Sequence, residues 1–160
     1  MHTDLSGSAL EITLLALQAL QVVILWTHDW IPLGRLNDVS AVRSQDTTQR
    51  LVVVTLMQSI PWTIGLFLSA SYFGHSYPSW VRYWLWVSYA VLFLGELRAW
   101  WLPYLFRAEP PRAARYKIMF GNTHTFFPQR NGMAPNTLHV VLHSLTAATL
   151  IALFMAEVRS

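Results

Sequence analysis

The sequence contains no cysteine, and only 12% of its 160 residues are charged. The absence of cysteine excludes a disulfide scaffold, a cysteine-ligated iron–sulfur cluster and a thiol nucleophile. The charged fraction is about half of the roughly 25% that soluble domains carry. The formal net charge is only +3, which gives no electrostatic reason to expect a nucleic-acid partner. Low charge combined with many aromatic residues also excludes a disordered chain and a long coiled coil.

Apolar and aromatic residues are abundant instead, at 54% and 14% of the chain. They concentrate in four segments, each close to the ~20 residues that cross a ~30 Å hydrocarbon layer as a helix: 9–30, 51–73, 80–101 and 137–158. In a soluble protein, a helix apolar nearly all round must be buried on every side, which so short a chain cannot arrange four times. The sequence therefore predicts an all-α integral membrane protein, with residues 1–160 forming one four-helix transmembrane bundle.

The distribution of basic residues predicts the orientation of this bundle. Nine of the 11 lysines and arginines lie in segments 31–50 and 98–135. By the positive-inside rule, loops 31–50 and 102–136 are expected in the cytoplasm and both termini outside. Lack of cysteine favours a bacterial inner (plasma) membrane. Within the longer loop, the basic and apolar residues of 110–120 predict a short interfacial helix at the lipid headgroups.

Each predicted span has a single polar face. At 100° per residue, its polar side chains fall in a narrow arc, so the economical arrangement is a bundle with these faces inward. The four faces comprise Glu11, Gln18, Gln21, His28 and Asp29; Thr55, Gln58, Trp62, Gly65, Ser69 and Tyr72; Arg82, Tyr89, Glu96 and Trp100; and Asn136, His139, His143 and Glu157. Glu11, Arg82 and Glu157 gather at the outer end, where we expect a structural salt bridge.

Ionisable groups from three spans converge on the cytoplasmic half of the predicted bundle. Polar side chains in hydrocarbon are costly, so their convergence favours a functional pocket, with interhelical hydrogen bonding as the alternative. The expected catalytic residues are His28, Asp29, Glu96, His139 and His143. The expected ligand-binding residues are Gln58, Trp62, Tyr89, Arg98 and Asn136.

This combination suits acid–base isomerisation, cyclisation or hydration of a small lipid, sterol or isoprenoid that enters from the inner leaflet. A carboxylate and a neighbouring histidine can exchange a proton, and aromatic ring faces can stabilise a carbocation. The architecture, with inward histidines and acids, is similar in outline to the sterol-isomerase and sigma-2 receptor group. The second span has Gln58-Ser-Ile-Pro61 where an acid is expected in that group.

Several alternatives stay open. No cofactor is expected, although His139 and His143, four residues apart, could hold a metal together with Glu96, as one histidine box of membrane di-iron hydroxylases does. The expected partners are membrane lipid and a hydrophobic small molecule, and a homodimer is also compatible. The chain could instead be an oligomeric transporter or channel subunit, or an accessory subunit of a membrane complex. The sequence therefore does not decide whether the protein is an enzyme.

Overall fold

The computed structural model describes residues 5–159, and the regular elements in this range are all helices, as predicted. The long helices are α1 (Leu5–Thr27), α3 (Thr48–Ser71), α4 (Ser79–Glu96) and α7 (Thr137–Arg159). The shorter elements are a 3₁₀ turn (Gly34–Leu36), α2 (Val39–Gln45), a π-helical segment (Leu97–Trp101), α5 (Leu102–Leu105) and α6 (Pro110–Phe120).

Three helices are long and apolar enough to cross a membrane, one fewer than predicted. They are Ala9–Thr27 within α1, Thr48–Ser71 (α3), and Thr137–Val158 within α7. The predicted span 80–101 is not among them. Arg82, Glu96 and several tryptophan and tyrosine residues lower the mean hydropathy of α4, and its α-helical part ends after 18 residues. The chain is therefore an all-helical membrane protein with three helices able to cross the bilayer.

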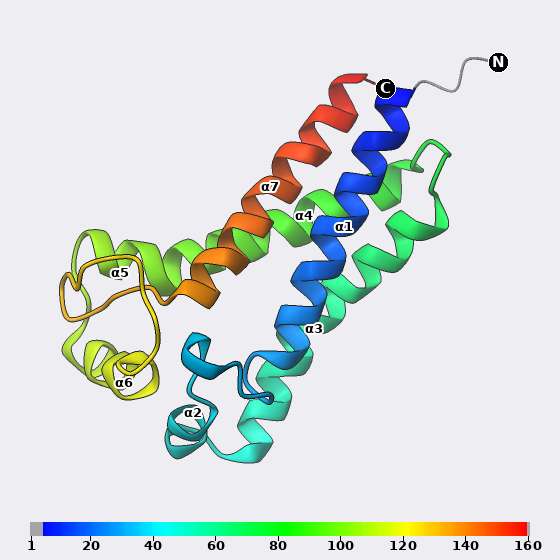
Figure 1. Ribbon diagram of the computed structural model, residues 1–160. Coiled ribbons are helices and arrows are strands. Elements are labelled where there is room, and N and C mark those ends of the chain that lie inside the picture. The colour runs from blue at the N-terminus through cyan, green and yellow to red at the C-terminus, as the bar shows by residue number, and fades with distance from the viewer. Residues whose placement is uncertain (1–4, 160) are drawn as a thin grey trace.

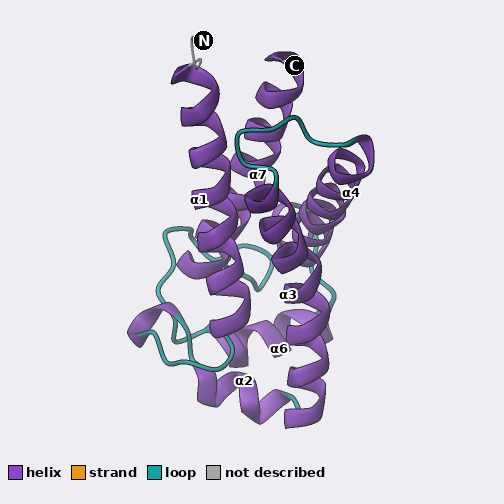
Figure 2. Cartoon of the chain, turned by 90° about the vertical axis from the view of Figure 1, so that its right-hand side faces the viewer, coloured by secondary structure: helices purple, strands orange, loops and turns teal. Residues whose placement is uncertain are grey.

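The four long helices pack against one another, and α1 and α7 contact each other most extensively. Helix α1 contacts α3 and α7, while α4 contacts α7 and α3. The start of α1 and the end of α7 lie at one end of the described structure, and α2, α5 and α6 lie at the other end (Figure 1). Figure 2 shows α2 and α6 together beside the lower part of α3. Helices α3 and α4 diverge from the hairpin that joins them, so they are far apart where they approach α6 (Figure 1).

The interior between the long helices contains polar as well as apolar side chains. Leu14, Leu25 and Leu85 belong to the apolar core, while Gln18 and Gln21 of α1 are completely buried beside them. The polar face predicted for the first span is therefore turned inward at these two positions. Burying amides is costly unless they find hydrogen-bond partners, which makes the contacts of these polar groups informative.

Helix α1 ends at Thr27, earlier than the predicted end at residue 30. His28 and Asp29 consequently lie in the turn after the helix rather than on its last turn. The Asn37 side chain stabilises this turn, because its Nδ2 donates to the carbonyl oxygens of His28 (2.6 Å) and Ile31 (2.8 Å). By contrast, α6 begins and ends at the predicted residues 110 and 120.

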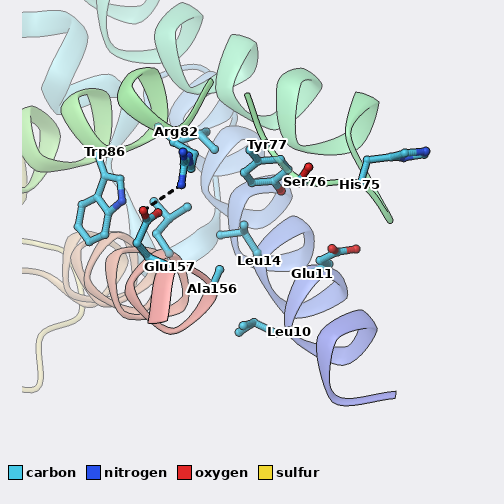
Figure 3. Close-up of a pocket in the computed structure, with 12 residues that line it drawn as sticks. Leu10, Glu11, Leu14, His75, Ser76, Tyr77, Arg82, Trp86, Ala156 and Glu157 are labelled. Atoms are coloured by element: carbon cyan, nitrogen blue, oxygen red, sulfur yellow. Dashed lines mark hydrogen bonds and ion pairs between the residues drawn. The ribbon is translucent and has the colours of Figure 1, made fainter. Parts of the chain in front are cut away.

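The end of the bundle near the termini holds the predicted salt bridge. Arg82 Nη1 lies 3.1 Å from Glu157 Oε1, which joins α4 to α7. Figure 3 shows this pair in a small pocket of about 170 Å³, with Glu11 at the opposite wall. Glu11 accepts a hydrogen bond from the backbone N–H of Gly74 (2.9 Å). Gly74 has φ +75°, a left-handed conformation that favours glycine, so this contact ties α1 to the turn between α3 and α4.

Candidate ligand-binding site

A cavity of about 450 Å³ lies where α3 and α4 diverge, and α1 and α7 contribute to its wall. We call it the inner cavity. Its mouth is formed by apolar side chains that are exposed on the outside of the helices: Val54 and Met57 of α3 and Val91 of α4. Its interior is lined by the buried residues Glu96 and His143. The cavity therefore opens sideways, on the surface that membrane-crossing helices present to lipid.

Three buried polar atoms at the cavity wall lack a hydrogen-bond partner among the described residues. They are Glu96 Oε2, Gln58 Nε2 and Trp62 Nε1, and their side chains come from α4 and α3. Leaving such a group unsatisfied costs about 1–3 kcal/mol. These three atoms are one carboxyl oxygen and two N–H donors, whereas other buried atoms without a partner, such as those of Gln18, belong to residues that do not line the cavity.

The other oxygen of Glu96 is held by a chain of hydrogen bonds that crosses the bundle. Gln21 Nε2 of α1 donates to Thr146 Oγ1 of α7 (2.7 Å), and the Thr146 hydroxyl lies 2.7 Å from Glu96 Oε1. The three groups are buried. Because Oε1 is anchored in this way, the carboxyl group is fixed in orientation, and Oε2 is buried without a partner among the described residues.

His139 is oriented by Asn136. Asn136 Oδ1 accepts from the backbone N–H of His139 (3.0 Å) and lies 2.6 Å from its Nδ1. Asn136 Oδ1 can only accept hydrogen bonds, so His139 Nδ1 must carry the proton of the neutral ring. The other ring nitrogen, Nε2, then has a free lone pair. Asn136 thus positions His139, and it lies outside the inner cavity.

His143 has the opposite tautomer. Trp101 Nε1 donates to His143 Nδ1 at 2.9 Å, and an indole N–H can only donate, so the proton of the neutral ring is on Nε2. The ring centroids of His139 and His143 are 6.0 Å apart. The pair therefore offers one lone pair and one N–H, which are the two groups that proton transfer to and from a ligand requires.

His28 connects this pair to a more polar hollow. Its Nδ1 lies 2.9 Å from the carbonyl oxygen of Ile24, and its Nε2 lies 3.3 Å from Asp29 Oδ2. Both neighbours are hydrogen-bond acceptors, and together they hold the His28 ring in the turn after α1. Asp29 lines an adjoining hollow of about 270 Å³, which shares His28, Gln58 and His139 with the inner cavity.

The π-helical segment Leu97–Trp101 positions three functional side chains. Such segments are rare and frequently occur at functional sites. Trp100 is buried with its ring centroid 4.2 Å from that of His139, Trp101 binds His143, and Arg98 is exposed towards α6. The feature of the sequence that indicates a disturbed helix at this place is Pro103, because proline has no N–H to donate to the carbonyl of Ala99.

The structure brings most of the predicted site residues to one place. The inner cavity is lined by His28, Gln58, Trp62, Glu96, His139 and His143. Asp29 lies in the adjoining hollow, Arg98 in a separate one, and Asn136 behind His139. Tyr89 lies in the apolar core, fully buried, and does not line the cavity. The sequence did not single out Thr146 or Trp101, because their importance comes from contacts between helices.

Within residues 5–159, no group of three or more histidine, aspartate or glutamate side chains is arranged so as to hold a metal ion. Comparisons with protein-family models, curated proteins and solved structures find no match to this chain.

Proposed function

We propose that this protein binds a small membrane-soluble lipid, sterol or isoprenoid in the inner cavity and converts it by acid–base chemistry. The observation that carries the proposal is that Glu96, Gln58 and Trp62, each with a buried polar atom that lacks a partner, line a cavity with an apolar mouth. A volume of about 450 Å³ lies in the range of ordinary small-molecule sites. An apolar molecule with one polar group satisfies both parts of such a site.

Entry is sideways between α3 and α4. The exposed side chains of Val54, Met57 and Val91 contact the apolar body of the molecule, while its polar group reaches Glu96 Oε2. His139 Nε2 accepts a proton from one carbon or oxygen of the ligand, and His143 Nε2–H or Glu96 returns a proton to another atom. Such an exchange moves a double bond or closes a ring without a net change in protons, as an isomerase or cyclase requires.

The proposal includes α4 as a fourth membrane crossing. The start of α1 and the end of α7 lie at one end of the described structure, and an even number of crossings has this result (Figure 1). The two charged residues of α4 have partners that reduce their cost in a membrane, since Arg82 pairs with Glu157 and Glu96 with Thr146. The arginine-rich loops 31–50 and 102–136 then lie in the cytoplasm, the termini lie outside, and the membrane is a bacterial inner membrane.

Blocking the mouth of the inner cavity tests the proposal. Replacing Val91 by tryptophan fills the opening between α3 and α4, and we expect the occupancy of a co-purified lipid-sized molecule to fall at least about tenfold. That fall corresponds to a loss of about 1.4 kcal/mol of binding free energy. The measurement is native mass spectrometry of the protein extracted in mild detergent.

Leu94→Trp is the matched control, because Leu94 is as exposed as Val91 on the same helix and does not line the cavity. It should retain the bound molecule. Wild-type protein without any bound molecule, or equal occupancy in the two tryptophan variants, would contradict the proposal and favour an accessory subunit instead.

A further inference from the structure

A second hollow, of about 440 Å³, lies between the π-helical segment and α6. We call it the basic hollow, because Arg98, Arg112 and Arg115 line it. Among the described residues that form its wall, none is acidic. Three guanidinium groups around one concave surface attract an anion, and the planar fork of arginine matches phosphate oxygens in pairs.

The three arginines differ in how many hydrogen bonds and ion pairs they already form within the protein. Arg115 forms an ion pair with the Asp46 carboxylate, which also binds Arg50 Nε at 3.1 Å. Arg112 Nη1 donates only to the carbonyl oxygen of Arg98, at 3.3 Å. The guanidinium of Arg98 makes no hydrogen bond or ion pair with the residues that the structure describes. The hollow therefore keeps a net positive charge and at least one uncommitted guanidinium.

Tyr116 forms the neutral part of this surface. Its hydroxyl donates to the carbonyl oxygen of Ala99 at 3.2 Å, which replaces the backbone hydrogen bond that Pro103 cannot make. Burial raises the pKa of the Tyr116 phenol, and the charges of Arg112 and Arg115 lower it by less. The phenol thus keeps its proton at neutral pH and adds no negative charge that would repel an anion.

The basic hollow and the inner cavity share a wall. Gly95 and Ala99 line both of them. These are the two smallest residues, and a Cβ placed on Gly95 would meet no atom within 4 Å. An elongated molecule can therefore lie across this stretch of α4, with its apolar part in the inner cavity and its head beside the arginines.

We propose that the ligand of the inner cavity is a lipid with a phosphate head, which binds in the basic hollow through Arg98 and Arg112. This inference rests on the proposed function, because the rest of the same molecule, its apolar part and the polar group that reaches Glu96, occupies the inner cavity. It narrows the ligand class to phosphate-bearing amphiphiles, such as phospholipids and isoprenoid phosphates, and excludes neutral sterols. The head group lies at the end of the molecule where α6 is found. Glu96, His139 and His143 then face the part of the lipid that is nearest its phosphate.

The test compares three probes on full-length protein in detergent. Dioctanoyl phosphatidic acid has both chains and phosphate, dioctanoylglycerol has the chains alone, and glycerol 3-phosphate has the phosphate alone. We expect wild-type protein to bind the phosphatidic acid at least tenfold more tightly than the diacylglycerol, measured by calorimetric titration. Glycerol 3-phosphate should not bind measurably.

The double substitution Arg98→Gln with Arg112→Gln should abolish the tenfold preference. Arg107→Gln with Arg130→Gln changes the net charge equally at exposed positions outside the hollow and should leave the preference intact. Lysine at positions 98 and 112 keeps the charge without the fork, so that variant should keep part of the preference. It also separates loss of recognition from loss of folding.

The outcomes separate this inference from the proposed function. Equal binding of the two lipids, with loss of both in Val91→Trp, would overturn the phosphate head and leave the cavity proposal in place. Failure of both lipids to bind would overturn both proposals. Binding of glycerol 3-phosphate as tight as that of the lipid would identify a free phosphate compound as the ligand and would overturn the lipid assignment.

Discussion

Replacing Glu96 by glutamine is expected to weaken ligand binding by about ten- to a hundredfold while leaving the fold intact. Hydrogen bonds to charged groups contribute about 1.5–3 kcal/mol, and each 1.4 kcal/mol is a factor of ten in affinity. Glutamine keeps an oxygen that accepts from Thr146, so the chain of hydrogen bonds to Gln21 survives. It loses the second carboxyl oxygen, which has no partner in the protein.

The measurement is rebinding, by delipidated protein, of the molecule that co-purifies with wild type, together with thermal unfolding. Conversion of that molecule should fall by about 10²–10⁴-fold, the usual contribution of a general acid or base. Glu157→Gln is the matched control, because it makes the same change at the far end of the bundle, where Glu157 pairs with Arg82. If the Glu96 variant unfolds instead, or binds as well as wild type, Glu96 serves helix packing and the acid–base role is wrong.

Truncating Trp100 to alanine is expected to cost about 3–5 kcal/mol of stability, as removal of a buried tryptophan usually does. Its ring lies 4.6 Å from that of Tyr116 and 4.9 Å from that of Phe120, measured between centroids. It also stacks against His139 at 4.2 Å. The side chain therefore joins α6 to α4 and α7, and its loss should release α6 and misplace His139.

Hydrogen exchange of residues 110–120 and thermal unfolding in detergent measure this effect. Exchange in α6 should accelerate in Trp100→Ala, while Trp100→Phe retains an aromatic contact and should recover much of the protection. Trp80→Ala serves as the control, because Trp80 is 57% exposed in α4, which continues directly into the π-helical segment that carries Trp100. Unchanged protection of α6 in Trp100→Ala would show that this helix is held by other contacts.

The helices that depend on local pattern could be predicted from the sequence. The uncharged run 51–73 indicates a membrane-crossing helix, and α3 covers it from Thr48 to Ser71. Two prolines followed by basic and apolar residues define α6 to the residue. The salt bridge expected among Glu11, Arg82 and Glu157 forms between Arg82 and Glu157. Helical periodicity and depth in the predicted spans were enough to place these side chains near one another.

Features that depend on contacts between helices could not be predicted. The π-helical segment changes the direction of Arg98 and Trp101, whereas a regular helix over 80–101 predicts other directions for them. Periodicity placed Tyr89 on the polar face, yet it cannot distinguish the wall of a cavity from the apolar core where Tyr89 lies. The divergence of α3 from α4, which creates the inner cavity, has no local signal either.

Asn136 and α2 illustrate the same limit at the start of helices. Asn136 is a polar residue at the correct depth for a ligand contact, but its oxygen is engaged by the backbone and ring of His139. Helix α2 lies within the loop 31–50, for which we predicted a cytoplasmic location and no helix. Its signal is Asp38, whose carboxylate accepts from the N–H of Ala41 at 3.0 Å as a helix cap.

The most direct test of the central claim is photocrosslinking from the mouth of the inner cavity in intact membranes. A photoreactive amino acid at Met57, which is 72% exposed and lines the cavity, is compared with the same amino acid at Leu56, which lies on another face at the same depth. The account predicts one dominant adduct mass at position 57 and the mixture of bulk membrane lipids at position 56. The same mixture at both positions would contradict the existence of a ligand site between α3 and α4.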